Sequence, residues 1–522
     1  MQLVNVLLPE IILAAVACLL LLLGTVNRAS ARRAAPLAAV ATLALVVLVL
    51  AWRTAGGLTA GLPVTLSAFS EYVKLLTALL GIVLLLLAWP TNPTATGNDS
   101  LDYGSDCGEF FALALLSLCG VMLVAGADDM VLLFLGLELV SIPTYVMVSI
   151  SRRAIVAQEA GVKYFFLGAL SAALMLFGFS YLYGATGTIR LSQVAVVMYT
   201  SGGFGAWHLL AVVMLLAGLA FKIAAVPLHF YAGDVYEGAA TPVTAFLAFV
   251  PKAAGFVAII KVLSAVAAPA GTAWVMSQQV LALLWVMAAL TMSVGNCLAL
   301  LQRNIKRVLA YSSIAHSGYM LVGLAALGVN APAAIQGVLF YLAAYGVMNV
   351  GAFGVLMLLP SRGGSGTAEE FDDIAGVGRH RPALGLAMAV SCFGLLGLPL
   401  TAGFLGKILL IKPALFSGQP AMVWLAVITV LNAAVSAGYY LKIVASLFLE
   451  ADGQPREQQP VLPQALPWPI KAAVAASVAG TLLLGAVPIA TQAVLNEALA
   501  GALATQPPVL QHLATQPVAE AR

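Results

Sequence analysis

Residues 130–150, MVLLFLGLELVSIPTYVMVSI, decide the fold class of this chain. An α-helix needs about 20 mostly apolar residues to cross the hydrocarbon core of a bilayer. This stretch has that length and carries a single ionisable side chain, Glu138, near its middle. It therefore predicts a membrane-spanning helix that holds a carboxyl group away from water.

The composition of the whole chain extends this pattern. Of the 522 residues, 62% are hydrophobic and 9% are charged, and the mean hydropathy is +1.02. Soluble domains carry about 25% charged residues, so this composition excludes a soluble enzyme. It also excludes a disordered chain, which needs low hydrophobicity and high charge. Strands of membrane β-barrels alternate apolar and polar residues, whereas the runs here are solidly apolar, so the sequence indicates a helical membrane protein.

Apolar runs of spanning length recur along the whole chain and are separated by polar or Gly/Pro-rich connectors. They predict an all-α polytopic membrane protein with about fourteen transmembrane helices. The runs fall near residues 3–24, 34–52, 66–89, 109–126, 130–150, 159–183, 206–227, 240–263, 273–300, 306–327, 332–360, 382–413, 421–449 and 469–495.

Lysine and arginine are distributed unevenly between the two sets of connectors, which predicts the orientation. With the N-terminus outside, only three basic residues lie in outside segments, namely Arg53, Arg190 and Arg522. The first run has no basic segment before it, so we expect it to be a retained span. Because the number of spans is even and the basic loops are expected inside, we expect both termini to face outward. The twelve basic residues of the inside loops are Arg28, Arg32, Arg33, Arg152, Arg153, Arg303, Lys306, Arg307, Arg362, Arg379, Arg381 and Arg456.

Cofactor and metal motifs are missing from the sequence. The five cysteines are scattered without a CxxC pair or metal-ligand spacing, and no GxGxxG or Walker motif is present. We therefore expect no iron–sulfur cluster, metal or nucleotide in this chain. If the protein takes part in redox or energy-coupled chemistry, electrons and nucleotides must be handled by other subunits.

Four ionisable residues lie inside apolar runs and are the strongest functional candidates. A charge at the bilayer centre costs at least about 2.5–3.5 kcal/mol, so such a group faces protein or water and often has a function. Helix-locking salt bridges are the structural alternative, but one carboxylate cannot pair with three lysines. Burial favours the neutral form of a lysine and a nearby carboxylate favours the charged form, so a row of such groups can pass protons. The four residues are Glu138, Lys222, Lys252 and Lys407.

Other ionisable residues of the spans have a structural interpretation of equal or greater weight. Glu71 and Lys74 are three residues apart on the third span, share one helix face and can neutralise each other. Lys261 and Lys412 lie close enough to span ends to extend into the interface. His316 is either a satisfied buried histidine or part of a proton path.

Proline and glycine interrupt two spans in corresponding places. Residues 225–233, AVPLHFYAG, resemble residues 397–406, GLPLTAGFLG, and each stretch is followed by a span with a lysine, Lys252 or Lys442. Because the two stretches are five spans apart, the copies would be inverted in the membrane, as in transporters built from inverted repeats. We therefore predict two inverted five-helix repeats with broken helices. The predicted segments are an N-terminal three-helix segment at 1–108, repeats at 109–265 and 266–450, and a last helix with a polar tail at 451–522.

Four stretches carry a resemblance to a known family. The chain resembles the antiporter-like subunits of respiratory complex I and of Mrp-type cation/proton antiporters, roughly from Glu109 to Glu450. The stretches are GLELVSIPTYVMV at 136–148, FKIAAVPLHFYAGDVYEGAATPVTAFLAFVPKAAG at 221–255, QRNIKRVLAYSSIAHSGYMLVG at 302–323 and GLPLTAGFLGK at 397–407.

The resemblance assigns roles to the four buried groups. Glu138 matches the family's helix-5 glutamate, Lys222 its helix-7 lysine, Lys252 its helix-8 lysine and Lys407 its helix-12 ionisable residue. The sister subunit M carries a glutamate at this last position, and the largest sister, L, is longer and ends in a lateral helix. The chain is therefore most similar to the third antiporter-like subunit of NADH:quinone oxidoreductase.

What the resemblance implies is a proton-translocating membrane-arm subunit. Glu138 and Lys222 would form an ion pair whose opening changes how readily Lys222 holds its proton. Lys252 would relay protons, and Lys407 would exchange them with the far side or the next subunit. Further candidates for the proton path are His229, Lys306, His316 and Lys442.

Partners and location follow from the same resemblance. Flavin, iron–sulfur clusters and the quinone cavity would belong to other subunits. The neighbours would be the antiporter-like M subunit, small K- and J-type subunits and the lipid of a bacterial plasma membrane, with no nucleic acid. Three alternatives stay open: an Mrp-type antiporter subunit, the membrane subunit of a hydrogenase- or ferredoxin-linked complex, and a scaffold that moves no protons.

Overall fold

The computed structural model of the chain describes residues 2–25, 29–52, 64–90, 106–152, 154–200, 205–270, 273–359, 369–449 and 468–486. The predicted polar tail after Ala504 lies outside these ranges. So do Arg28, Arg53, Arg153, Arg362, Arg456 and Arg522, which contributed to the orientation prediction.

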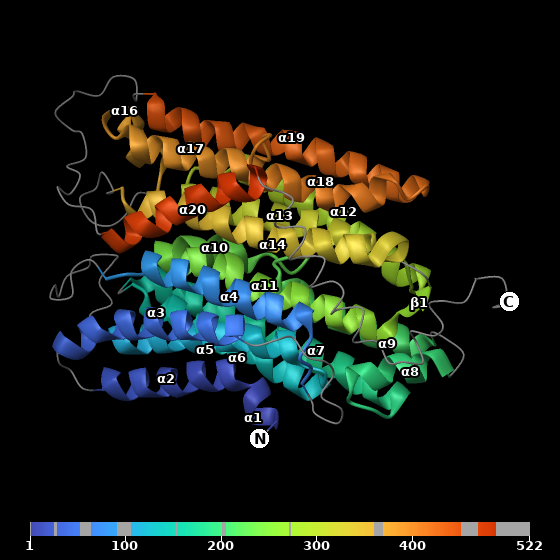
Figure 1. Cartoon of the computed structure of the whole chain (residues 1–522). Helices are drawn as coiled ribbons and strands as arrows, with labels where there is room; N and C mark the ends of the chain where they lie inside the picture. The colour runs from blue at the N-terminus through green and yellow to red at the C-terminus, as the bar shows by residue number, and fades with distance from the viewer. Residues whose placement is uncertain are drawn as a thin grey trace.

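The described chain is a bundle of roughly parallel and antiparallel helices (Figure 1). Eleven helices are long and apolar enough to cross a membrane, and three shorter apolar helices, α2, α9 and α17, complete the crossings. The helices that correspond to the fourteen predicted runs are α2 (Leu8–Gly24), α3 (Ala29–Trp52), α4 (Ala68–Leu87), α5 (Cys107–Gly126), α6 (Met130–Ile150), α7 (Ile155–Thr186), α9 (Ala206–Lys222), α11 (Thr241–Val266), α12 (Gln278–Leu300), α13 (Ile305–Ala325), α14 (Leu327–Met357), α17 (Pro382–Leu396), α19 (Pro420–Phe448) and α20 (Trp468–Ala486).

Two of the crossings are broken, as the proline and glycine pattern predicts. The first consists of α9 and α10 (Tyr231–Gly238), and the second of α17 and α18 (Ala402–Leu415). Each connecting segment contains an exposed proline and one non-glycine residue with positive φ, Ala224 at 54° and Leu400 at 71°. Left-handed backbone is uncommon for residues other than glycine and ends a right-handed helix, so the same device interrupts both spans.

Some short elements do not form crossings of their own. Between α11 and α12 a two-stranded antiparallel hairpin pairs β1 (Ala268–Ala270) with β2 (Ala273–Val275). Four short helices lie outside the crossings: α1 (Gln2–Val6), α8 (Leu191–Thr200), α15 (Phe371–Ile374) and α16 (Val377–His380).

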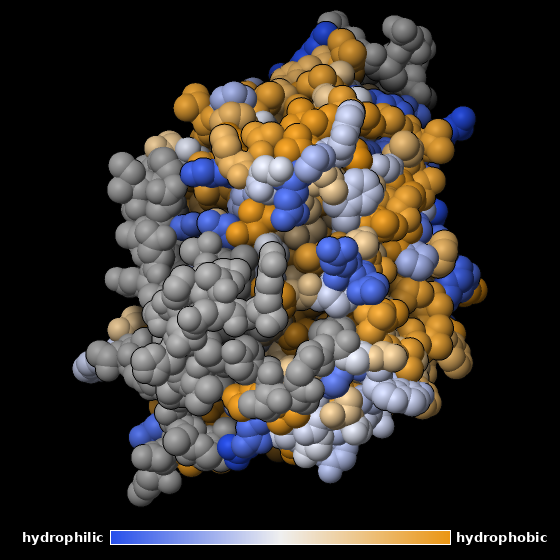
Figure 2. Space-filling model, turned by 90° about the vertical axis from the view of Figure 1, so that its right-hand side faces the viewer, coloured by the Kyte–Doolittle hydropathy of each residue, from blue (hydrophilic) through white to orange (hydrophobic). Residues whose placement is uncertain are grey.

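Burial differs sharply between helices. The most apolar windows of α11, α13 and α14 are 100%, 94% and 89% buried, whereas those of α7 and α19 are 33% buried. The outward faces of α7 and α19 carry exposed large apolar side chains such as Phe166 and Trp424, which suits contact with lipid or with other subunits. In the end-on view of Figure 2, apolar side chains cover the upper and right-hand flanks and polar ones gather nearer the centre.

The two ends of the bundle are identified by the residues that flank α6. Asp129 precedes the helix, and its carboxylate accepts hydrogen bonds from the Val131 and Leu132 amides, whereas Arg152 follows the other end of the helix. Arg152 lies beside Lys306 at the start of α13, so we call this end the basic end. The loop before α6 lies at the opposite end, where Asp129 pairs with Arg190 in a β-bridge. We call this the Asp128 end.

Candidate functional site

Glu138 and Lys222, which are 84 positions apart in sequence, form an ion pair in the interior of the bundle. The Lys222 ammonium donates to the Glu138 carboxylate at 2.9 Å and to the Ser141 hydroxyl at 2.6 Å. The side chains are 4% and 17% exposed. Ser141 follows Glu138 by three residues on α6, so both acceptors lie on one face of that helix.

The break in the first span is what places Lys222 at this position. Lys222 is the last residue of α9, and the chain turns at Ala224. Neighbouring hydroxyls satisfy the polar backbone groups that the break frees: Tyr231 donates to the Phe221 carbonyl at 2.9 Å, and Ser317 donates to the Ile223 carbonyl at 2.6 Å. This is the condition under which irregular backbone is tolerated inside a membrane.

Lys252 is connected to this break by α13. Its ammonium donates to the Ser313 carbonyl and, at 3.0 Å, to the Ser317 hydroxyl, which in turn bonds the Ile223 carbonyl. The side chain is 2% exposed. Within the described ranges no carboxylate lies within 4.0 Å of this ammonium. Lys252 is therefore a buried lysine held by neutral oxygens.

His316 lies on the same helix, directly before Ser317 and one turn after Ser313. Nδ1 lies 2.7 Å from the Tyr341 hydroxyl on α14, and Nε2 lies 2.9 Å from the Tyr440 hydroxyl on α19. Tyr440 also bonds Ser312. Both ring nitrogens thus have hydroxyl partners, which can give or accept a proton.

Lys407 lies at the second broken span. Its ammonium donates to the Leu395 and Leu396 carbonyls at 3.1 and 2.7 Å, at the C-terminal end of α17. It also lies 4.8 Å from the centre of the Tyr319 ring, whose helix, α13, carries His316. The carbonyl end of a helix attracts a cation, so the first half of this span holds the lysine of the second half.

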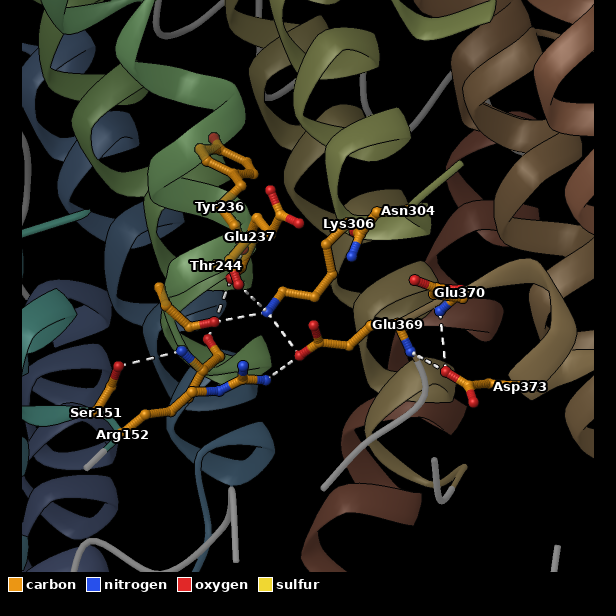
Figure 3. Close-up of polar contacts among 12 residues, drawn as sticks. Ser151, Arg152, Tyr236, Glu237, Thr244, Asn304, Lys306, Glu369, Glu370 and Asp373 are labelled. Carbon is orange, nitrogen blue, oxygen red and sulfur yellow. Dashed lines mark hydrogen bonds and ion pairs between the residues drawn. The ribbon is translucent and has the colours of Figure 1, made fainter. Parts of the chain in front are cut away.

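Lys306 repeats this arrangement at the basic end (Figure 3). Its fully buried ammonium donates to the Glu237 and Ala239 carbonyls at the C-terminal end of α10, at 2.9 and 2.7 Å. It also pairs with Glu369 at 3.2 Å, and Arg152 reaches the same carboxylate from the other side. Lys306 and Lys407 therefore each cap a half-helix of a broken span.

Glu369 lies outside the spans, in the connector between α14 and α17, and its surroundings hold it charged. Partial burial raises the pKa of this carboxyl, but the Lys306 and Arg152 cations outweigh that effect, and the pKa is below the ordinary value of 4.5. The amides of Glu369 and Glu370 both bond the Asp373 carboxylate, at 2.9 and 3.0 Å, which orders the start of α15. The Ile305 amide at the start of α13 donates to the Glu369 carbonyl at 2.7 Å and attaches this segment to α13.

Two of the sequence-predicted residues lie apart from this chain of groups. His229 is buried in the first break, where Nδ1 lies 3.3 Å from the Pro227 carbonyl and the ring lies against Phe230. Lys442 is exposed on α19, with its ammonium 4.3 Å from the centre of the Phe371 ring. Neither is linked to the four core residues by a described hydrogen bond.

The hydroxyl groups that contact the predicted residues could not be identified from the sequence. They are neutral, so the search for charges in apolar runs could not find them; the connecting residues are Ser141, Ser312, Ser313, Ser317, Tyr341 and Tyr440. Two carboxylates, Glu10 and Glu369, were also missed. Glu10 lies inside the first apolar run and could have been found by the rule that found Glu138, whereas Glu369 lies in a polar connector, where a carboxylate carries no signal.

Comparison with protein families gives one match over most of the chain. Residues 127–433 match the family described as NADH:quinone oxidoreductase/Mrp antiporter, TM. This range lies within the stretch over which the sequence resemblance was drawn and includes the four predicted core residues.

Several similar proteins are named NADH-quinone oxidoreductase subunit N. The chain is 40% identical over 496 residues to NADH-quinone oxidoreductase subunit N of Trichlorobacter lovleyi, covering 93% of this chain and 94% of the relative. It is 39% identical over 452 residues to subunit N of Rhodospirillum rubrum, covering 86% and 88%.

Solved structures agree in fold. A chain of respiratory complex I from Thermus thermophilus with bound aureothin matches with a TM-score of 0.74 and 33% identity, over 93% of this chain and 99% of that chain. A chain of the Mrp complex from Dietzia sp. matches with a TM-score of 0.76 at 21% identity, over 98% and 100%, which shows the fold alone. The protein is therefore a multi-pass membrane protein that belongs to the NADH-quinone oxidoreductase subunit N family.

Proposed function

We propose that this chain translocates protons in the membrane arm of an NADH:quinone oxidoreductase, driven by quinone reduction in other subunits. The observation that carries the proposal is the buried row Glu138, Lys222, Lys252, His316 and Lys407, which extends across two broken helices. Hydroxyls and carbonyls connect the first three of these residues. His316 is on α13, the helix that also carries Ser313 and Ser317, and Lys407 contacts the Tyr319 ring of that helix. Buried ionisable groups are costly in a membrane, and a row with one carboxylate and three lysines exceeds what helix locking requires.

The roles follow from the contacts of each group. While Glu138 holds Lys222 at 2.9 Å, the carboxylate stabilises the ammonium form. When a conformational or electrostatic signal separates them, Lys222 releases its proton more readily. Lys252 can receive the proton when its side chain is the neutral amine. Its nitrogen bonds the Ser317 hydroxyl, which also bonds the Ile223 carbonyl at the first break. His316, with its two tyrosine partners, then stands between Lys252 and Lys407.

Lys407 is the group we propose to exchange protons with the far side or with the neighbouring subunit. Lys306 is proposed as the entrance group, since it lies at the basic end and is bound to both α10 and Glu369. His229 and Lys442 remain weaker candidates for the path.

The surroundings of the chain are part of the proposal. The neighbours would be the antiporter-like M subunit and small K- and J-type subunits, which carry the arm toward flavin, iron–sulfur clusters and quinone elsewhere. The basic end would face the cytoplasm of a bacterium, with both termini outside. The breaks at Ala224 and Leu400 support the division into repeats at 109–265 and 266–450, between a segment at 1–108 and a last segment at 451–522.

Lysines of α18 provide a matched test. Lys407 is buried, whereas Lys412 on the same helix is exposed. In the purified complex, reconstituted in liposomes with a pH-sensitive dye, Lys407→Met and Lys252→Met should reduce NADH-driven proton uptake about tenfold or more, as expected when a proton-transfer group is removed. Lys412→Met should leave it unchanged.

Three results would contradict the proposal. If Lys407→Met and Lys252→Met both pump normally, the chain is a scaffold that moves no protons. If the purified assembly does not oxidise NADH but exchanges sodium for protons, the chain is a subunit of an Mrp-type antiporter. An assembly that oxidises hydrogen or ferredoxin instead of NADH would place the chain in a related membrane complex.

A further inference from the structure

A second group of buried charges lies among the N-terminal helices, outside the row described above. Lys74 on α4 is 0% exposed and pairs with Glu10 on α2 at 2.8 Å. Glu71, one turn earlier on α4, lies 4.0 Å from the same ammonium. We call Glu10, Glu71 and Lys74 the N-terminal triad.

The triad contains one more carboxylate than ammonium. With both glutamates ionised it carries a net negative charge in the protein interior, which is costly. One carboxyl can take up a proton and leave the group neutral, with the 2.8 Å pair intact. The composition of the triad therefore allows one proton to bind and leave, which a simple one-to-one salt bridge does not.

The triad is close to a second lysine and to the end of the bundle. The Lys74 ammonium lies 3.9 Å from the position that a side chain would occupy at Gly126, the last residue of α5. The Lys261 ammonium donates to the carbonyl of the next residue, Ala127, at 2.7 Å. Lys261 is within electrostatic range of both Lys74 and Asp128, so its charge can compensate an ionised triad.

Asp128, which lies in the connector between α5 and α6, is the next ionisable residue near Lys261. Its carboxylate accepts hydrogen bonds from the amide and hydroxyl of Ser192, at 3.1 and 2.7 Å. Partial burial raises the pKa of Asp128, although Ser192 and Lys261 act in the opposite direction. This carboxyl lies at the Asp128 end of the bundle, opposite the end that holds Lys306.

We propose that the N-terminal triad, Lys261 and Asp128 form a second proton-exchange site, which takes up and releases protons at the Asp128 end. The inference rests on the proposed function, since it adds to the same proton transfer a site on the side away from the basic end. Lys261 and Lys252 both lie on α11, nine residues apart, or about 13 Å along the helix, so the two sets of groups share one rigid element.

A purely structural ion-pair group between α2 and α4 is the alternative, and removing all of its charges together distinguishes it. Replacing every partner of a buried ion pair is often neutral for stability, whereas removing one partner leaves an uncompensated charge. The Glu10→Gln/Glu71→Gln/Lys74→Met triple variant removes all three charges of the triad and should therefore assemble and unfold like the parent complex. In liposomes its NADH-driven proton uptake should fall about tenfold or more. Normal uptake in this variant would overturn the proposal.

The control is an exposed ion pair of the same length. Glu159 and Lys163 also lie 2.8 Å apart, but their side chains are 59% and 44% exposed. Glu159→Gln/Lys163→Met should pump at the parent rate. If the triple variant fails to assemble, proton uptake by Glu71→Gln tests the proposal, because this single change removes the additional carboxylate and keeps the 2.8 Å pair. Unchanged pumping by Glu71→Gln also overturns the proposal.

The same preparations separate this proposal from the proposed function. If Lys252→Met and Lys407→Met abolish uptake while the triad variants pump normally, only the second site is wrong. If the lysine variants pump normally as well, the proposed function itself is wrong.

Discussion

The two broken spans use the same backbone device but hold their lysines differently. Lys222 at the first break faces the Glu138 carboxylate at 2.9 Å, a full opposite charge. Lys407 at the second break faces two carbonyls at the end of α17 and an aromatic ring. A helix end supplies only about half a charge. At the first break, the lysine charge is therefore neutralised by a carboxylate that a conformational signal can move away. At the second break, the lysine charge is stabilised only by partial charges.

The largest expected effect comes from removing the carboxylate of the first break. Glu138→Gln leaves Lys222 buried with Ser141 and an amide, and breaking a buried pair costs about 3–5 kcal/mol. We expect lower thermal stability and loss of NADH-driven proton uptake in the purified complex. In Glu138→Gln/Lys222→Met the stability should return while pumping stays lost. Recovery of both would mean that the pair is only structural.

A carboxylate at the second break should sharpen the comparison. Lys407→Glu would place a negative charge against the carbonyl end of α17, which favours cations by up to about 2 kcal/mol. Thermal unfolding should therefore occur at a lower temperature than in Lys407→Met. Equal unfolding temperatures of the two variants would show that the α17 carbonyls contribute little to holding Lys407.

The link between the two breaks is expected to have a smaller effect. Tyr440→Phe removes the hydroxyl that bonds His316 Nε2 and Ser312, and an unsatisfied buried group costs about 1–3 kcal/mol. Proton uptake should slow, while Tyr183→Phe, at a half-exposed position on α7, serves as the control. An unchanged rate would exclude Tyr440 from the path between the halves.

The smallest effect concerns the contact that joins the halves at the basic end. Because the folded pKa of Glu369 is below 4.5, its stabilising contribution is fully present above pH 4.5 and is lost as the pH falls through the folded value. Glu369→Gln should abolish this part of the pH dependence of thermal unfolding. Glu159→Gln, which alters an exposed carboxyl, should retain it; the same acid profile in all three proteins would contradict the assigned role of Glu369.

Much of the fold could be predicted because a bilayer permits few solutions. Spans must be long and apolar, and prolines inside them mark breaks, so the crossings and both interruptions were confirmed. Charges in apolar runs are rare and costly, which is why Glu138, Lys222, Lys252 and Lys407 could be named. Lys412, which was expected to extend toward the interface from near a span end, is exposed on α18.

Partner choice could not be predicted. Glu71 and Lys74 were interpreted as a mutual pair, but the structure adds Glu10 from another helix as the closer partner of Lys74, at 2.8 Å against 4.0 Å. Lys261 was expected to extend toward the interface, and the partner that it finds there, the Ala127 carbonyl at the end of α5, could not be named from sequence. Both outcomes depend on which helices pack together, and local spacing does not contain that information.

The sequence by itself determined the membrane location, the number of crossings, the two breaks and the identity of the costly charges, because each follows from the free energy of placing a residue in hydrocarbon. Tertiary structure alone decided which charge meets which partner and which neutral hydroxyls connect them. Hydrogen bonds act over about 3 Å, and residues such as Lys222 and Glu138, or Ser317 and Ile223, are brought within that distance only by helix packing.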